Sequence, residues 1–127
     1  MTDSPLPHLD PAIYSELDSS SPVVALESTV ITHGLPRPEN LILARDMERI
    51  IRENGAIPAT VAVLDGKIRV GLSDTELERL ANETNPRKIS RRDFASAIIR
   101  KECGGTTVAG TLFAAQQAGV KVFATGG

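Results

Sequence analysis

Apolar residues gather in short runs along the chain, and these runs predict the strands. Residues 23–26 form a continuous apolar run without alternation, which is typical of a strand buried on both faces. A second run of this kind covers residues 60–64. The Asp65-Gly66 pair that follows is a strong signal for a two-residue hairpin, so the alternating segment 67–70 predicts a more exposed return strand. A last strand is expected over residues 120–124.

Helical spacing replaces these runs between residues 39 and 54, directly after a loop at 35–38 whose two prolines exclude regular structure. Gly55 is well placed to end this helix. Its apolar stripe consists of Leu43, Met47, Ile50 and Ile51. The other positions of the helix carry Arg45, Glu48, Arg49 and Arg52.

Two capping boxes, at residues 73–76 and 90–93, predict that helices begin near Asp74 and Arg91. The second of these helices is expected to continue to about residue 102 and to bury Phe94, Ala97 and Ile98. The Cys-Gly-Gly sequence then breaks it. Residues 106–118 predict a further helix that is apolar on most sides and therefore deeply packed.

This order of elements predicts an α/β fold with helices layered on a mixed sheet. Residues 1–21 are rich in Pro, Ser and Asp, which indicates a flexible leader with a short helix at 11–17, and residues 22–127 form the domain. The chain ends in a Gly-Gly turn directly after the last strand, where such folds place ligand sites. We therefore expect either a minimal site or a piece of a longer protein.

The composition narrows the class of protein. The 127 residues suffice for one domain, and an aromatic content of 3% indicates an aliphatic core. A net charge of −2 gives no general attraction to nucleic acid or to an anionic membrane. No apolar run approaches the roughly 18 residues that span a bilayer. The acidic first twenty residues argue against a targeting signal, and a single cysteine, Cys103, suits a reducing cytoplasm.

Glu27 and Lys88 are the first candidates for chemistry. Glu27 directly follows a buried strand, where desolvation would raise its pKa and let it hold a proton near neutral pH. A carboxylate that merely caps a helix or pairs with a cation is the alternative. Lys88 lies in a basic cluster, residues 87–92, next to a predicted helix start, which suits a phosphate. A solvated basic patch is the more frequent explanation of such a cluster.

Three further features are weaker. The Gly104–Thr107 segment precedes a helix and could offer backbone donors and hydroxyls to an anion, although a turn between helices is more common. His33 lies in a Thr-His-Gly turn, and with only one other histidine a histidine metal site is improbable. Cys103 is most simply read as an inert, half-buried thiol.

Several segments, taken together and in order, resemble the pseudouridine-5′-phosphate glycosidases, which are also grouped as indigoidine synthase A-like proteins. The segments are VVALESTVITHG at 23–34, GAIPAT at 55–60, VGLS at 70–73, KISRRD at 88–93, GTTVA at 105–109 and GVKVFATGG at 119–127. The resemblance extends from about residue 22 to the end of the chain. Each segment alone is modest evidence, but the ordered set is specific.

The resemblance implies an enzyme that reversibly cleaves the C–C glycosidic bond of pseudouridine 5′-phosphate to uracil and ribose 5-phosphate. It also implies an α/β/α fold, a manganese cofactor, a homotrimer and a Schiff base between the sugar and a lysine. The family's proton-donating glutamate corresponds to Glu27. Its substrate-contacting residues correspond to Lys88 and Val108, and we add the neighbouring Thr106 and Thr107 as candidates for substrate binding.

The family pattern continues beyond Gly127 with its metal-binding aspartate and its covalent lysine. Neither position exists here, and none of the four lysines, Lys67, Lys88, Lys101 and Lys121, aligns with the covalent one. The resemblance therefore implies an N-terminal part of the enzyme that is inactive alone. The alternative hypothesis is a short non-catalytic paralogue that acts as a binding or assembly module.

Overall fold

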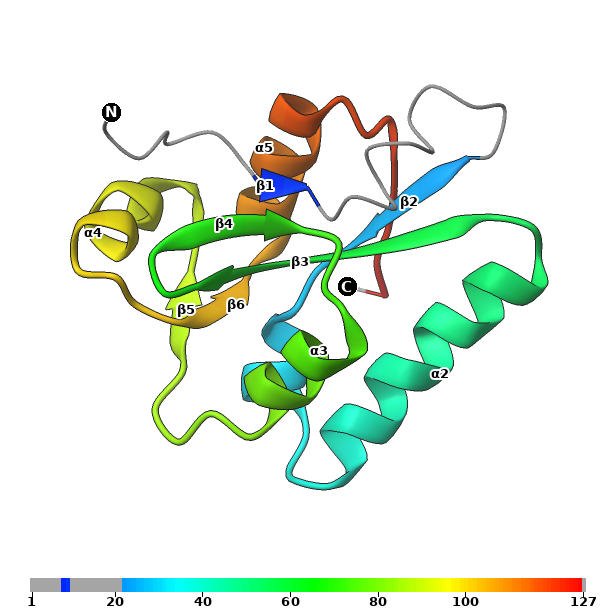
Figure 1. The fold of residues 1–127 in the computed structure, drawn as a ribbon, viewed down its shortest axis with the longest axis horizontal. Coiled ribbons are helices and arrows are strands. Elements are labelled where there is room, and N and C mark those ends of the chain that lie inside the picture. Colours follow the sequence, from blue (N-terminus) through cyan, green and yellow to red (C-terminus); the bar gives the residue numbers. More distant parts are fainter. Residues whose placement is uncertain (1–7, 10–21, 127) are drawn as a thin grey trace.

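The structure, a computed structural model, describes residues 8–9 and 22–126 (Figure 1). The strands are β1 His8–Leu9, β2 Val23–Leu26, β3 Ile57–Leu64, β4 Lys67–Val70, β5 Arg87–Ile89, β6 Gly104–Thr106 and β7 Val122–Ala124. The α-helices are α2 Glu39–Glu53, α3 Asp74–Ala81, α4 Phe94–Ile99 and α5 Val108–Ala118. Two short turns complete the description, the π-helical η1 Val30–Gly34 and the 3-10 helical η2 Arg91–Asp93.

The strands form a mixed sheet around the long strand β3, in the order β1-β4-β3-β2-β7 (Figure 1). The first half of β3 pairs with β2 in parallel, and β2 pairs with β7 in parallel on its other side. The second half of β3 pairs with β4 and β6, both antiparallel, and β6 carries β5 in parallel. The strands β2 and β6 therefore follow one another along the same edge of β3.

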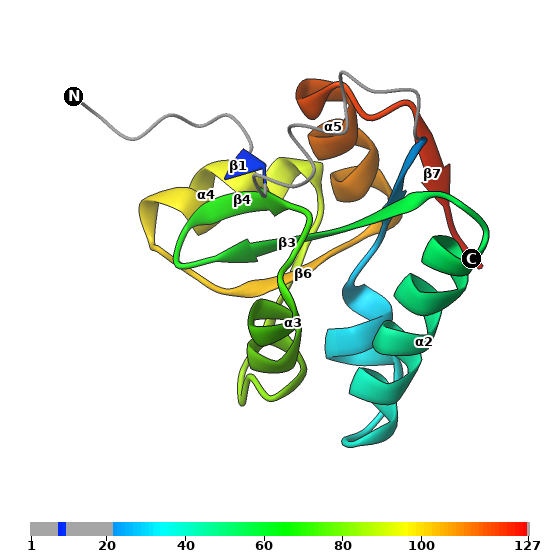
Figure 2. The same cartoon turned by 45° about the vertical axis from the view of Figure 1, so that its right-hand side comes forward.

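Helices cover both faces of this sheet, which gives three layers (Figure 2). Side chains alternate along a strand. In β3, Ala59, Val61 and Val63 face the core beneath α4 and α5, whereas Ala62 and Leu64 face the core beneath α2 and α3. The predicted α/β fold with a mixed, largely parallel sheet is confirmed, because unalternated apolar runs do mark strands buried on both faces.

Three local signals, at one turn and at two helix ends, are confirmed. Asp65 and Gly66 both have positive φ, 50° and 74°, as a tight hairpin between β3 and β4 requires. At the start of α3 the N–H of Glu76 donates to the Ser73 hydroxyl at 3.2 Å, and the N–H of Ser73 donates to the Glu76 carboxylate at 3.0 Å. Gly55 follows α2 with a φ of 82°, the left-handed conformation that ends many helices.

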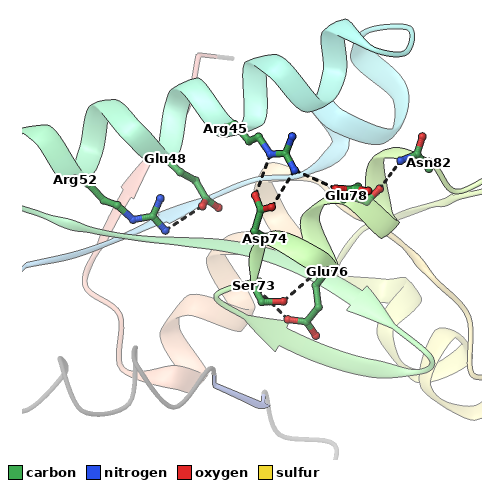
Figure 3. A network of polar contacts seen from close by, with 8 residues as sticks. All are labelled: Arg45, Glu48, Arg52, Ser73, Asp74, Glu76, Glu78 and Asn82. Carbon is green, nitrogen blue, oxygen red and sulfur yellow. Dashed lines mark hydrogen bonds and ion pairs between the residues drawn. The ribbon is translucent and has the colours of Figure 1, made fainter.

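Polar contacts join α2 to α3 (Figure 3). The Arg45 guanidinium binds Asp74 at 2.9 Å and Glu78 at 3.1 Å. All three side chains are largely exposed, so solvent screens both ion pairs and they contribute little to stability. Most of the stability of this contact therefore comes from the apolar packing beneath it.

Helix α2 is confirmed, but its buried face is not its apolar stripe. An amphipathic helix ordinarily buries its apolar side chains. Here the buried residues are Asn40, Ala44 and Glu48, and Glu48 had been placed among the polar positions outside the stripe. The stripe residue Ile50 is 51% exposed. Small and hydrogen-bonding side chains thus pack on the sheet, and the stripe faces elsewhere.

The region between residues 86 and 107 differs most from the prediction. The segment that was expected to break one helix and begin the next is strand β6, and β5 was not predicted at all. Helix α4 ends at Ile99 rather than near residue 102, although Phe94 and Ala97 are buried as predicted. Helix α5 buries one face, through Gly110, Thr111, Ala114 and Ala115, rather than most of its surface.

The predicted leader, including the short helix at 11–17, lies outside the described residues apart from His8–Leu9. These two residues form β1, which pairs in parallel with β4. No helix within residues 8–9 and 22–126 is long and apolar enough to cross a membrane.

Candidate functional site

An open cleft of about 730 Å³ lies where β2 and β7 end, between η1 and α2. It is lined by Leu26, Glu27, Thr29, Val30, His33, Gly34, Leu43, Met47, Ile50, Ile51, Lys88, Ala124, Thr125 and Gly126. The connection from β2 leads through α2 to β3 on one side, whereas β7 joins β2 on the other side after α5. In α/β sheets, ligands bind at such points, outside the carboxyl ends of strands whose connections diverge.

Glu27 lines this cleft directly after β2 and is half-buried. Leu26 pairs with Ala124, so the two residues that follow, Glu27 and Thr125, are neighbours across the strand ends. The Thr125 hydroxyl donates a hydrogen bond to the Glu27 carboxylate. This contact fixes the orientation of the carboxylate at the wall of the cleft.

Lys88 reaches the same cleft from β5, and its side chain is exposed there. Its neighbour Arg87 points the other way, as alternation in a strand requires. Arg87 binds Glu102 and, at 3.2 Å, Asp93. The predicted basic cluster is therefore divided, and Lys88 supplies the positive charge that the cluster brings to the cleft.

The other three predicted site residues lie behind the cleft and do not line it. Thr106 is fully buried, and its hydroxyl donates to the Val61 carbonyl at 2.9 Å. Thr107 caps α5, with its hydroxyl accepting from the N–H of Gly110 at 3.2 Å. Val108 is the half-buried first residue of α5. Substrate contacts by these residues stay predictions.

The cleft also contains residues to which the sequence assigned no role. His33 lies on η1 with its Nδ1 atom 2.6 Å from the Thr32 hydroxyl, which fixes the imidazole ring. Thr29 and Thr125 add two hydroxyls. Thr29 follows a predicted strand closely, and this position could have indicated it as a site residue. Thr125 reaches the cleft because β7 pairs with β2, and the sequence does not reveal this pairing.

A metal site is not formed by the described residues alone. Among residues 8–9 and 22–126, no group of three or more His, Cys, Asp or Glu side chains could hold an ion. Glu27 and His33 are the only such side chains among the residues that line the cleft. Manganese prefers several oxygen ligands. These residues therefore do not fit a complete manganese site.

Cys103 lies away from the cleft, beside the β3–β4 hairpin. Its sulfur is 3.4 Å from the Arg79 guanidinium and accepts from the N–H of Asp65, also at 3.4 Å. Burial raises the pKa of the Cys103 thiol above its ordinary value. A thiol that stays protonated is a poor nucleophile, in agreement with the inert thiol predicted from the sequence.

Comparisons with known proteins agree on one group of relatives. The family model described as indigoidine synthase A like protein matches residues 12–127. A pseudouridine-5′-phosphate glycosidase of Glaesserella parasuis is 56% identical over 106 residues, which are 84% of this chain and 35% of that protein. A protein of the same name from Solibacter usitatus is 55% identical over 119 residues, 94% of this chain and 40% of that protein.

Two solved structures share the fold over almost the whole chain. The prealnumycin C-glycosynthase AlnA, in complex with ribulose 5-phosphate, has a TM-score of 0.84 at 39% identity and covers 98% of this chain and 40% of its own. An indigoidine synthase A-like protein from Thermotoga maritima has a TM-score of 0.84 at 32% identity and covers 100% and 41%. The chain thus spans about two fifths of the length of these relatives.

Proposed function

The chain belongs to the indigoidine synthase A-like family, and we propose that it supplies Glu27 and Lys88 to the active site of a pseudouridine-5′-phosphate glycosidase. The reaction adds water to pseudouridine 5′-phosphate. The bond between C1′ of the ribose and C5 of the uracil breaks, C5 receives a proton, and C1′ becomes the aldehyde carbon of ribose 5-phosphate. The reverse reaction forms the same C–C bond.

The observation that carries this proposal is that a carboxyl group and an ammonium group share one cleft at the carboxyl ends of β2 and β7. A C–C bond has no heteroatom that can take a proton as it leaves, so the carbon itself must be protonated by a positioned acid. We assign this role to Glu27. Lys88 would bind the phosphate, since an ammonium group suits a phosphate as a point charge.

The relatives support the substrate class. Two glycosidases named for pseudouridine 5′-phosphate are more than half identical to the chain over the matched residues. AlnA forms C-glycosides and was solved with ribulose 5-phosphate, a five-carbon sugar phosphate. A cleft that holds a pentose phosphate beside a C–C glycosidic bond agrees with both.

Several further properties are proposals that rest on the resemblance. They are a dependence on manganese, a homotrimeric assembly, a cytoplasmic location and a Schiff-base lysine. The lysines of this chain do not align with the covalent lysine, and the described residues do not form a manganese site. The roles assigned to Glu27 and Lys88 are therefore confined to proton transfer and substrate binding.

A chimera tests the proposal, because the chain spans 35% to 40% of the length of its curated relatives. In the Glaesserella parasuis enzyme, the segment that matches this chain is replaced by the corresponding residues of this chain. Release of uracil from pseudouridine 5′-phosphate is then followed by chromatography, with manganese present. The unmodified 127-residue chain is assayed in parallel, and we expect it to release none.

Glu27→Gln in the chimera is expected to lower kcat about 100- to 10,000-fold, the range for loss of a general acid. Its melting temperature should stay unchanged, since Glu27 is only half-buried. Glu53→Gln, at an exposed position on α2 outside the cleft, is the matched control. A folded chimera without activity, or near-normal turnover by Glu27→Gln, would remove the proposal.

The alternative of a short binding or assembly module is favoured by a specific feature, the partly exposed apolar stripe of α2. A module of this kind would bind its partner through the stripe and would release no uracil in any context. Activity of the chimera therefore separates the two hypotheses.

A further inference from the structure

Three hydroxyl side chains, Ser28, Thr106 and Thr111, are buried together at 0% exposure directly behind the cleft. The Ser28 hydroxyl donates to the Val61 carbonyl at 2.5 Å, and the Thr106 hydroxyl donates to the same carbonyl at 2.9 Å. The hydroxyls of Thr106 and Thr111 are 2.8 Å apart. The surrounding core is aliphatic, so this hydroxyl cluster is a local exception that needs a reason.

The hydroxyl cluster joins two segments that do not pair as strands. Ser28 follows β2, and Thr106 is the last residue of β6. The N–H of Thr106 donates to the Ser28 hydroxyl at 2.8 Å, and the N–H of Ser28 donates to the Thr106 carbonyl at 3.2 Å. These directional bonds fix the end of β2 against the end of β6, which apolar contacts alone would leave less well defined.

A cleft residue lies next to the cluster on each side, Glu27 on the segment after β2 and Lys88 on β5, which pairs with β6. Glu27 immediately precedes Ser28. Lys88 pairs with Gly105, which immediately precedes Thr106. A Cβ atom on Gly105 would lie 2.8 Å from the Ser28 carbonyl oxygen, so the two backbones approach more closely than any other residue allows. The path from Glu27 to Lys88 therefore runs through Ser28, Thr106 and Gly105.

We propose that Ser28 and Thr106 are positioning residues that set the separation of the Glu27 carboxyl group from the Lys88 ammonium group. The expected effect on catalysis rests on the proposed function. The structural part of the inference, that the hydroxyl cluster fixes both cleft residues, stands independently. A purely structural role would stabilise the core without affecting how the two cleft groups act together.

The test in the chimera compares Ser28→Ala and Thr106→Val, which remove the hydroxyls, with Thr106→Ser, which retains one. The matched control is Thr60→Val, another buried threonine of the sheet, whose hydroxyl donates to Glu48 at 2.7 Å outside the cluster. We expect Ser28→Ala and Thr106→Val to lower kcat about 10- to 100-fold, the effect of a misplaced catalytic group. Thr106→Ser should recover most of this loss.

The control variant is expected to lower the melting temperature to a similar degree with less than about a twofold change in kcat, because its hydroxyl bonds to Glu48 and not to Ser28 or Thr106. If kcat followed the melting temperature alone across all four variants, the positioning role would be refuted. The same holds if Thr106→Ser did not recover activity.

A second measurement on the 127-residue chain does not depend on turnover. Backbone amide spectra recorded by NMR should show shifts at Glu27 and Lys88 in Thr106→Val that are absent in Thr60→Val. Unchanged amides of both cleft residues would overturn the inference even if the chimera is active. If the chimera is inactive but the shifts appear, the proposed function fails and the positioning of the two residues stands.

Discussion

The two faces of the sheet differ in the side chains that lie between the sheet and its helices. Beneath α4 and α5 lies an apolar core that includes Val61, Ile89 and Phe94, together with the buried hydroxyl of Thr111. Beneath α2 the buried face holds Asn40 and Glu48, while the apolar stripe of the same helix lines the cleft. The apolar stripe of a helix therefore does not by itself show which face the helix buries on the sheet.

The polar residues buried beneath α2 are tolerated because each has a defined partner. The Asn40 amide donates to the carbonyls of Ile31 at 3.1 Å and Ala81 at 2.9 Å, which ties α2 to η1 and α3. Glu48 accepts from Thr60 and pairs with Arg52 at 3.3 Å. A buried polar group without such partners would cost stability. Directional bonds thus add to the apolar core that also lies beneath α2 and α3.

Removing a large side chain from the core beneath α4 and α5 should have the largest effect on stability. Phe94 is buried and packs on Phe113 with ring centroids 5.7 Å apart. Phe94→Ala is expected to lower the free energy of unfolding by about 3–5 kcal/mol, measured by urea denaturation of the chain. Met47→Ala on the cleft wall should cost less than about 1 kcal/mol, because Met47 is half-buried. Equal losses of unfolding free energy in the two variants would show that the cleft wall contributes as much to stability as the core beneath α4 and α5.

The elements that could be predicted from the sequence are those with local causes. The β3–β4 hairpin follows from Asp65-Gly66, and the start of α3 follows from the Ser73–Glu76 capping box. Strands β5 and β6 have no such signal. They are three residues long, and β6 exists because Gly105 pairs with Ala62, far away in the sequence. Short strands formed by distant pairing lie outside what local patterns can indicate.

The residues of the candidate site also divide into those that the sequence could indicate and those that depend on distant pairing. Glu27 could be placed because it ends a recognisable buried strand, and Lys88 because it belongs to the ordered set of family segments. The strand position of Thr106 could not be foreseen, since a turn followed by a helix from residue 106 was expected there. The contact of Thr125 with Glu27 spans 98 residues and depends on the register of β7 with β2.

The second prediction concerns the positive charge that Lys88 brings to the cleft. Lys88→Ala in the chimera should raise KM for pseudouridine 5′-phosphate about 10- to 100-fold, the value of a hydrogen bond to a charged group. The effect on kcat should be small, because Lys88 is assigned to binding. Lys67→Ala, at an exposed lysine of β4 outside the cleft, is the control. An unchanged KM would show that Lys88 is only surface charge.

The third prediction concerns the carboxyl group buried beneath α2. Burial, only partly offset by Thr60 and Arg52, raises the pKa of Glu48 above its ordinary value. The folded state therefore binds this proton more tightly than the unfolded state, so the contribution is fully present below the ordinary carboxyl pKa. It is lost as the pH rises through the folded-state pKa.

Glu48→Gln removes this titration while keeping an acceptor for the Thr60 hydroxyl. Relative to the natural chain, the variant should be more stable at pH 7 than at pH 4. Urea denaturation at pH 4, 5.5 and 7 measures this difference. Glu53→Gln, at an exposed carboxylate on the same helix, should show no such trend. Parallel pH dependences for the two variants would show that Glu48 titrates as a surface group.

The smallest effect on stability is expected at the exposed end of the α2 stripe. Ile50 lines the cleft and is 51% exposed, so Ile50→Ser should change the free energy of unfolding by less than about 0.5 kcal/mol. Ile99→Ser on α4, at a position that is 80% exposed and outside the cleft, should change it as little.

Self-association should separate these two variants. Ile50 belongs to a continuous apolar wall with Leu43, Met47 and Ile51, and such walls promote association, whereas a single exposed apolar residue does not. Sedimentation velocity of the chain at increasing concentration should therefore show less association for Ile50→Ser and no change for Ile99→Ser. If neither variant changed association, the stripe would serve the cleft alone, and the exposed apolar wall of α2 would be a surface for ligand rather than for protein.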